Sequence, residues 1–186
     1  GHRIAVAPFT QPAGLQTDVA SIVAADLMRS GKFSPIASSA IPQGSVVNGQ
    51  VNVDVAAITG AEIIIFGKVV PKGGKYDVEF QVVGLQGANK GKVLAHYNGL
   101  APQSLMRQAS HRISDRVYEL YTGSKGAFRT RIAYIVYRHG QPYPYQLMTS
   151  DYDGFNETPI LKSTQPIMTP SWSPDGTRLA YVSFEG

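Results

Sequence analysis

The sequence predicts an α/β domain, with a mixed sheet and packed helices, followed by an all-β fragment of a β-propeller. Apolar residues recur at helical spacing only before Gly123, and beyond it short strand-like runs alternate with turns rich in proline, glycine and aspartate. The segment Arg131–Val136 (RIAYIV) returns as Arg178–Ser183 (RLAYVS). That offset of about 47 residues is close to the period of a propeller blade.

The bulk composition excludes several classes of function. The 186 residues are 43% hydrophobic and 16% charged, with a formal net charge of +4. No run of lysine or arginine is longer than two residues, so no nucleic-acid-binding stripe is predicted. The absence of cysteine excludes disulfides, thiolate zinc sites and cysteine nucleophiles. No apolar run reaches the ~18 residues of a membrane span, so we do not expect a membrane-embedded protein.

A strand and an amphipathic helix are predicted first. Arg3–Phe9 is a short apolar run closed by Pro8, which indicates a buried strand. The helix that follows is expected to have Thr17 as its N-cap and Gly31 as its C′ residue. Its apolar stripe comprises Val19, Ile22, Val23 and Leu27.

The sequence in the middle of the domain predicts three consecutive strands. Ala61–Val70 is β-branched and nearly all apolar, which is typical of a central strand covered on both faces. The turn Lys72–Lys75 joins it to a second strand at Tyr76–Leu85, and a third is expected at Lys92–Asn98. A short strand at Phe33–Ala37 and a short helix over Asn52–Thr59 are expected upstream.

A long amphipathic helix is predicted between Pro102 and Gly123, because proline is favoured in a first turn and glycine at a helix end. The apolar face is expected to comprise Met106, Ala109, Ile113, Val117, Leu120 and Tyr121. The solvent face is expected to comprise Arg107, Arg112, Asp115, Arg116 and Glu119.

Three parts follow from this pattern: an α/β domain over residues 3–122, a hinge over 123–130, and a first blade with the start of a second over 131–186. The blade strands are expected at Arg131–Arg138, Tyr145–Thr149, Thr158–Leu161 and Arg178–Phe184, with Ser150–Asn156 as a turn. In the motif WSPDG, Pro174, Asp175 and Gly176 predict a tight turn, and Trp172 is placed to wedge between blades.

Few residues could carry chemistry, and we predict no catalytic, cofactor-binding or metal-binding residue. The histidines at 2, 96, 111 and 139 are scattered. The run DYDGFNE, with Asp151, Asp153 and Asn156, resembles a calcium loop but lacks the third acidic position and the closing glutamate, which favours a turn. Gly87–Lys92 lacks P-loop spacing and is expected to be a solvated loop. No G-x-S-x-G nucleophile elbow occurs.

Five segments together resemble the TolB family of the bacterial cell envelope. They are IVAADLMRSGKFSP (residues 22–35), SKGAFRTR (124–131), the pair FRTRIAYIV and SDYDGFN, and WSPDGTRLAYVSFE (172–185). The propeller motif alone is unspecific, but its combination with the helix and the hinge is specific. The resemblance covers nearly the whole chain.

This resemblance implies a periplasmic, non-enzymatic adaptor of the Tol–Pal system with a WD40-like propeller. Such an adaptor binds peptidoglycan-associated lipoprotein through its propeller and TolA through its N-terminus, supports outer-membrane integrity and cell division, and is used by some colicins. Family members have six blades and a further upstream segment, so we expect this chain to be a truncated member. Gly1–His2 resembles an expression-vector remnant.

Two interpretations stay open at this stage. Arg129 and Arg131 could hold the two domains together as a hinge, or be ordinary surface arginines. The rival function is the propeller portion of a serine peptidase of the prolyl-oligopeptidase type, which shares the WSPDG repeat. That rival requires a hydrolase domain with a nucleophile elbow.

Overall fold

The computed structural model describes residues 1–124, 126, 131–172 and 179–183. The chain divides into two compact units, Gly1–Phe128 and Arg129–Gly186. The first is the α/β part and the second is all-β, as the sequence predicts. The finer division into a hinge over residues 123–130 stays a prediction, because most of those residues lie outside the described part of the chain.

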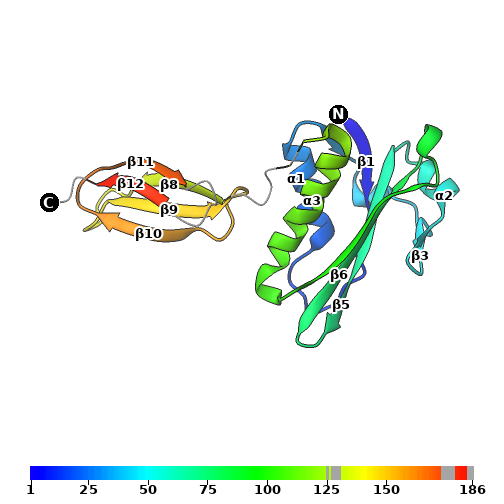
Figure 1. The fold of residues 1–186 in the computed structure, drawn as a ribbon, viewed down its shortest axis with the longest axis horizontal. Helices are drawn as coiled ribbons and strands as arrows, with labels where there is room; N and C mark the ends of the chain where they lie inside the picture. The colour runs from blue at the N-terminus through cyan, green and yellow to red at the C-terminus, as the bar shows by residue number, and fades with distance from the viewer. Residues whose placement is uncertain (125, 127–130, 173–178, 184–186) are drawn as a thin grey trace. The chain divides into compact units, whose positions relative to one another are not determined.

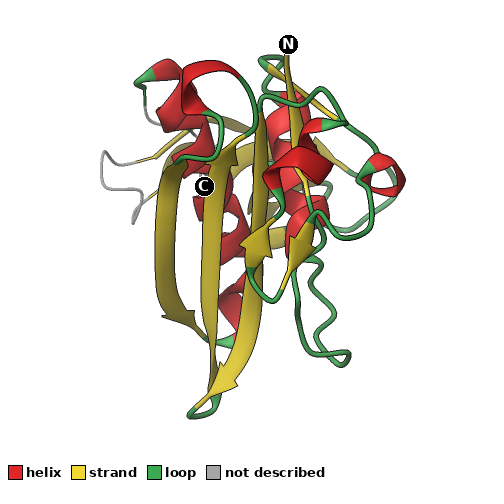
Figure 2. Cartoon of the chain, turned by 90° about the vertical axis from the view of Figure 1, so that its right-hand side faces the viewer, coloured by secondary structure: helices red, strands yellow, loops and turns green. Residues whose placement is uncertain are grey.

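A five-stranded mixed sheet forms the centre of the first unit. The strands are β2 (Phe33–Pro35), β1 (His2–Val6), β5 (Ile63–Lys72), β6 (Lys75–Gly84) and β7 (Val93–Ala101), and they lie in that order. The strands β2, β1 and β5 are parallel to one another, whereas β5, β6 and β7 form an antiparallel meander. The predicted mixed sheet is therefore confirmed. Figure 2 shows the long strands with red helices behind them.

Two helices, α1 (Val19–Arg29) and α3 (Met106–Thr122), pack against each other beside the sheet (Figure 1). The N-cap of α1 is Asp18, whose carboxylate accepts a hydrogen bond from the Ser21 amide at 3.2 Å. The prediction of Thr17 as the cap was wrong by one residue. Both residue types suit a cap, so composition alone does not choose between neighbours.

The long helix α3 follows the 3₁₀ turn η3 (Gln103–Leu105) and ends at Gly123, whose φ of 70° is left-handed. Met106, Ile113 and Val117 are buried as predicted, but Leu120 is 42% exposed. The buried arc instead includes four polar residues, namely Ser110, His111, Ser114 and Asp115. The predicted solvent-facing position of Asp115 was therefore wrong.

The opposite face of the sheet is covered only in part. Ile64 and Phe66 of β5 are buried there in a cluster with Val83 and Leu85, against the segment that contains η1 (Ser38–Ala40), β3 (Val46–Val47), β4 (Gln50–Val51) and α2 (Val53–Ala57). The distal residues of β5 on this face, including Lys68, are exposed. The prediction that β5 is covered on both faces therefore holds only for its first half.

In the second unit, β8 (Arg131–Tyr137), β9 (Tyr145–Asp151) and β10 (Thr158–Ser163) form an antiparallel sheet in the order β10-β9-β8. The strands β11 (Ile167–Trp172) and β12 (Leu179–Ser183) form a second, two-stranded sheet. β11 packs against β8 and β9. The sequence did not predict β11, because its proline and short polar residues carry no strand pattern.

The predicted loops take the expected forms. The turn after β9 closes with hydrogen bonds from the Gly154 amide to Asp151 and from the Asp151 amide to Phe155, and Gly154 and Asn156 have positive φ. The predicted turn is thus confirmed. The loop Gly87–Lys92 contains the single 3₁₀ turn η2 (Gly87–Asn89) and is exposed.

One close approach in the sheet leads to a stability prediction. A methyl group at Gly67 would overlap the Glu79 carbonyl oxygen and lie 2.6 Å from the Phe9 ring, whereas one at Gly99 of β7 would meet nothing within 4 Å. Gly67→Ala is expected to destabilise the first unit by about 2–3 kcal/mol through overpacking. Gly99→Ala, the matched control, should change its stability by less than about 1 kcal/mol.

Urea unfolding followed by circular dichroism at 222 nm checks this prediction, because the described helices all lie in the first unit. Equal midpoints for the two variants would contradict the close approach of β5, β6 and the segment after β1.

Candidate functional site

The sequence-predicted hinge residues cannot be placed as a site. Arg129 lies outside the described residues, and for Arg131 the structure gives only the backbone, as the first residue of β8 paired with Asp151. Their role in holding the domains stays a prediction.

Most of the predicted blade motif also cannot be placed. Trp172 ends β11, where its backbone pairs with Leu179 of β12. Pro174, Asp175 and Gly176 lie outside the described residues. The tight turn and the wedging of Trp172 therefore also stay predictions.

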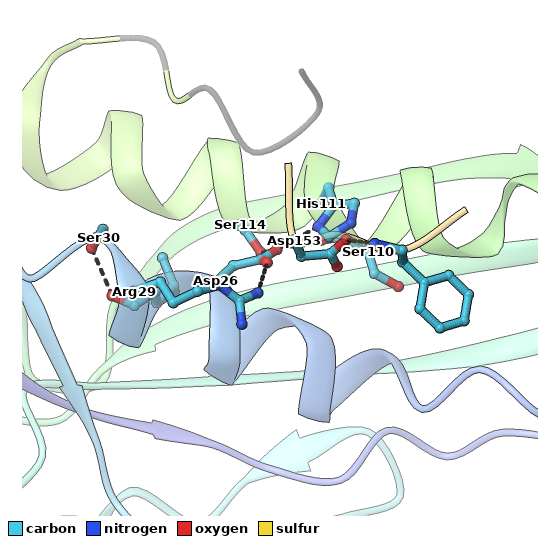
Figure 3. Close-up of polar contacts among 9 residues, drawn as sticks. Asp26, Arg29, Ser30, Ser110, His111, Ser114 and Asp153 are labelled. Atoms are coloured by element: carbon cyan, nitrogen blue, oxygen red, sulfur yellow. Dashed lines mark hydrogen bonds and ion pairs between the residues drawn. The ribbon is translucent and has the colours of Figure 1, made fainter. Parts of the chain in front are cut away.

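The most conspicuous polar cluster in the first unit joins α1 to α3. The Asp26 carboxylate on α1 accepts hydrogen bonds from Nδ1 of His111 at 2.7 Å and from the Ser114 hydroxyl at 2.6 Å (Figure 3). Arg29, one turn further along α1, donates to the other carboxylate oxygen at 3.1 Å. The side chains of Asp26, His111 and Ser114 are buried, while Arg29 is half exposed.

Helical spacing puts these groups in register. Asp26 lies three residues after Val23 and next to Leu27, both fully buried, so it occupies the apolar stripe of α1. His111 and Ser114 are three residues apart on α3 and therefore share one face of that helix. A buried carboxylate is costly unless it is hydrogen-bonded, and this cluster supplies the donors.

The cluster contains an aspartate, a histidine and a serine, but it is not a catalytic triad. In a triad the serine hydroxyl donates to the histidine, which accepts its proton. Here the Ser114 hydroxyl donates to Asp26 and lies 3.3 Å from the Ser110 carbonyl oxygen. The serine and the imidazole both donate to the same carboxylate oxygen, so this geometry does not activate Ser114 as a nucleophile.

Sequence reasoning missed this cluster because its two halves are far apart in the chain. An aspartate inside the apolar stripe of the first helix was the available signal, since a charged residue at a buried position needs a partner. Nothing in the pattern of α3 identified His111 and Ser114 as that partner.

A second cluster surrounds Tyr121 at the end of α3. Its ring contacts Phe33 edge-on, with centroids 5.1 Å apart, and His2 at 4.7 Å. Burial, the negative charge of Glu62 and a hydrogen bond to Glu62 raise the pKa of Tyr121 to about 12. Each of these effects favours the neutral phenol over the phenolate.

The second unit has a cluster of hydrogen-bonded polar side chains beside β8 and β9. Arg138 donates to Gln146 at 3.0 Å and to Glu157 at 3.4 Å, and the Tyr134 hydroxyl also donates to Glu157. The hydrogen bond to Glu157 raises the pKa of Tyr134. In the neighbouring turn, Asn156 donates to Asp151 at 3.0 Å, which fits the predicted turn.

A shallow hollow of about 280 Å³ lies beside α1 and β2. Its only ionisable lining residue is Asp18, which already caps α1. The hollow therefore offers no acid–base pair. No helix in the described ranges is long and apolar enough to span a bilayer.

Comparison with known proteins gives consistent matches along the chain. Residues 1–90 match the TolB amino-terminal domain, and residues 118–186 match the TolB beta propeller domain. The Tol-Pal system protein TolB of Mannheimia succiniciproducens is 46% identical over 184 residues, and that of Pasteurella multocida 44% over 186. Each alignment covers 98% of this chain, and the chain spans 43% of the length of each relative.

A solved structure agrees with these matches. TolB from Acinetobacter baumannii superimposes with a TM-score of 0.86 at 32% sequence identity. The match covers 100% of this chain and 44% of that one.

The buried cluster predicts a large effect of removing its carboxylate. Asp26→Ala would leave His111 and Ser114 buried without their acceptor, and we expect it to lower the free energy of unfolding by about 3 kcal/mol. Ser114→Ala should lower the free energy of unfolding by about 1 kcal/mol. Ser21→Ala, on the exposed side of α1, should change stability by less than about 0.5 kcal/mol.

Urea unfolding at 222 nm measures all three variants. If Asp26→Ala cost no more than Ser21→Ala, the cluster would not be what holds α1 on α3.

The Tyr121 cluster predicts an alkaline transition. The Tyr121 phenol ionises near pH 10 in an unfolded chain but only near pH 12 in the folded chain. The contribution of this phenol to the stability of the fold is therefore fully present below pH 10 and is lost as the pH rises toward 12. The difference in absorbance at 295 nm between the parent and Tyr121→Phe should titrate with a midpoint of about 12.

Glu62→Gln is expected to lower that midpoint, because it removes the negative charge. Glu79→Gln, on a different strand, is the control and should leave it unchanged. An unshifted midpoint in Glu62→Gln would exclude the carboxylate as a cause.

Proposed function

Because this chain belongs to the TolB family, we propose that it serves the Tol–Pal system of the cell envelope as a non-enzymatic, periplasmic adaptor. The observation that carries the proposal is the succession of the two TolB domain types in one chain, at 46% identity to a Tol-Pal system protein. The relatives are about twice as long as this chain, so the activity of the whole protein is part of the proposal.

The relatives support a non-catalytic role, because they are named as Tol-Pal system proteins. The one described Asp–His–Ser group has its serine hydrogen-bonded to the aspartate. The rival function, a propeller belonging to a serine peptidase, shares the WSPDG repeat, but the chain matches TolB domains and we do not propose it.

The partners we propose are peptidoglycan-associated lipoprotein, through the propeller, and TolA, through the N-terminal segment, with colicins as further ligands. These contacts would support outer-membrane integrity and cell division. In this scheme Arg129 and Arg131 couple the two domains, so that a change at the hinge shifts the choice of partner.

Calorimetric titration tests the proposed partners. The soluble domains of peptidoglycan-associated lipoprotein and of TolA are titrated into this chain and into the full-length relative from Mannheimia succiniciproducens. We expect the full-length relative to bind both domains, and this chain to bind the lipoprotein at least tenfold more weakly, because it spans 43% of the relative. Failure of both proteins to bind either partner would contradict the adaptor function.

The same titration with Arg129→Gln and Arg131→Gln, introduced at the aligned positions of the relative, tests the hinge. We expect the ratio of the two affinities to change. If both variants bound each partner as the parent does, the coupling would have to lie elsewhere.

A further inference from the structure

The strand β7 leaves a long free edge on the sheet of the first unit. It pairs with β6 on one side and ends the strand order on the other. Its register is regular over seven consecutive pairs, from Ala95 opposite Val82 to Ala101 opposite Tyr76. Alternate residues of an edge strand direct their N–H and C=O groups away from the sheet, where another strand can pair with them. The other edge strand, β2, has only three residues and includes Pro35.

This edge carries few of the features that normally prevent strand addition. Proteins protect edges with prolines, with short strands or with charges in the strand. Residues 93–101 contain no proline and no lysine, arginine or carboxylate, and the bulge lies at the end of the strand, near Val93. Val93, Tyr97 and Leu100 are 58%, 44% and 57% exposed. The chain therefore presents an extended, partly apolar template.

A basic border accompanies the edge on the side of the helices. The Arg116 guanidinium of α3 lies 4.5 Å from the centroid of the Tyr97 ring, which places this face of α3 above β7. Arg112 is exposed and lies one helical turn before Arg116, on the same stripe. His96 lies on the opposite face of β7 from Tyr97, where it faces Gln81 and contacts Glu79 at 3.1 Å. We call Arg112 and Arg116 the basic border.

The carboxylates near this border are mostly paired. Glu119 lies 3.6 Å from Arg116, whereas Glu79, which contacts Lys68 at 3.8 Å and His96 at 3.1 Å, lies on the face of the sheet away from the helices. Asp77 faces Leu100 across the ladder, on the side of the sheet away from the helices. The helix side of the edge therefore has an excess of positive charge.

We propose that the edge of β7 binds an extended, acidic segment of a partner protein, which adds to the sheet as a sixth strand. Backbone hydrogen bonds to Ala95–Ala101 supply the pairing. Alternate carboxylates of the segment lie toward Arg112 and Arg116, and the intervening apolar side chains lie on the other face, beside Leu100. This surface is distinct from the propeller and the N-terminal segment, so the inference does not rest on the proposed function.

Charge argues against a second copy of the chain as the occupant. Pairing β7 with β7 would bring two basic borders together, and β7 itself contains no acidic residue to offset them. Like charges that face one another across an interface disfavour association. An acidic segment removes this repulsion and gains attraction at the same positions.

The test uses a fluorescein-labelled peptide, acetyl-(Glu-Val)₄-amide, and the full isotope-labelled chain. Fluorescence anisotropy should show saturable binding that weakens as salt is raised, because the border is exposed to solvent. Slowed hydrogen exchange should be confined to Ala95–Ala101 and its flanks, and amide shifts to the same residues and to α3 around Arg112 and Arg116. Acetyl-(Lys-Val)₄-amide should not bind. The acidic peptide with N-methyl groups on alternate residues should not bind either, because it cannot complete the ladder.

Charge reversal on α3 provides the matched variants. Arg112→Glu should lower the affinity for the acidic peptide about fivefold or more, and Arg112→Gln should lower it by less. Lys32→Glu makes the same change of charge beside β2, at the other edge, and should alter the affinity by less than about twofold. Circular dichroism shows whether each variant keeps its helices.

Three results would overturn the proposal. Equal binding of the N-methylated peptide would mean that charge alone attracts the peptide. Peptide-induced shifts that leave β7 unaffected would place the site elsewhere. Sedimentation of the chain as a dimer, with Ala95–Ala101 protected before any peptide is added, would identify a second copy as the occupant.

Discussion

The buried carboxylate of Asp26 is the contact on which the layers of the first unit depend. It binds Ser114 and His111, so it fixes both the distance and the rotation of α3 relative to α1. That rotation directs Ile113 and Val117 into the core and leaves Arg116 above Tyr97 at the sheet edge. One buried carboxyl group, placed where apolar residues are the rule, thus determines which face of the long helix is exposed.

The strands and helices of this fold were largely predictable because their signals are local. The helical spacing of Val19, Val23 and Leu27 and the glycines at 31 and 123 located α1 and α3 to within a few residues. The predictions that were wrong concern residues whose burial depends on neighbours far away in the sequence. Leu120 looks like a core residue by spacing, but His111 takes part in the buried face because Asp26 lies opposite it. The partial cover of β5 likewise depends on the segment from η1 to α2, which packs against the cluster that includes Ile64 and Phe66.

The polar chemistry of the first unit is largely internal. Asp26 holds two helices together, and the Tyr121 phenol is bonded to Glu62 beside the first strand. Side chains committed in this way stabilise a scaffold and are poorly placed to bind a partner. Exposed backbone and surface charge, rather than these internal groups, are what this unit offers to a partner. The second unit also has internal polar groups, since its strand β9 buries Gln146, Thr149, Ser150 and Asp151.

The position of β1 has a consequence for the order of folding. This first strand lies between β2 and β5, and Ile4 pairs with Ile63 on one side and Pro35 on the other. The meander β5-β6-β7 contains only neighbouring strands and can form from local contacts, whereas β1 must wait for a loop of about sixty residues to close. Because β1 precedes β5 along the chain, it is synthesised before this sheet neighbour and completes its pairing only after β5 has emerged.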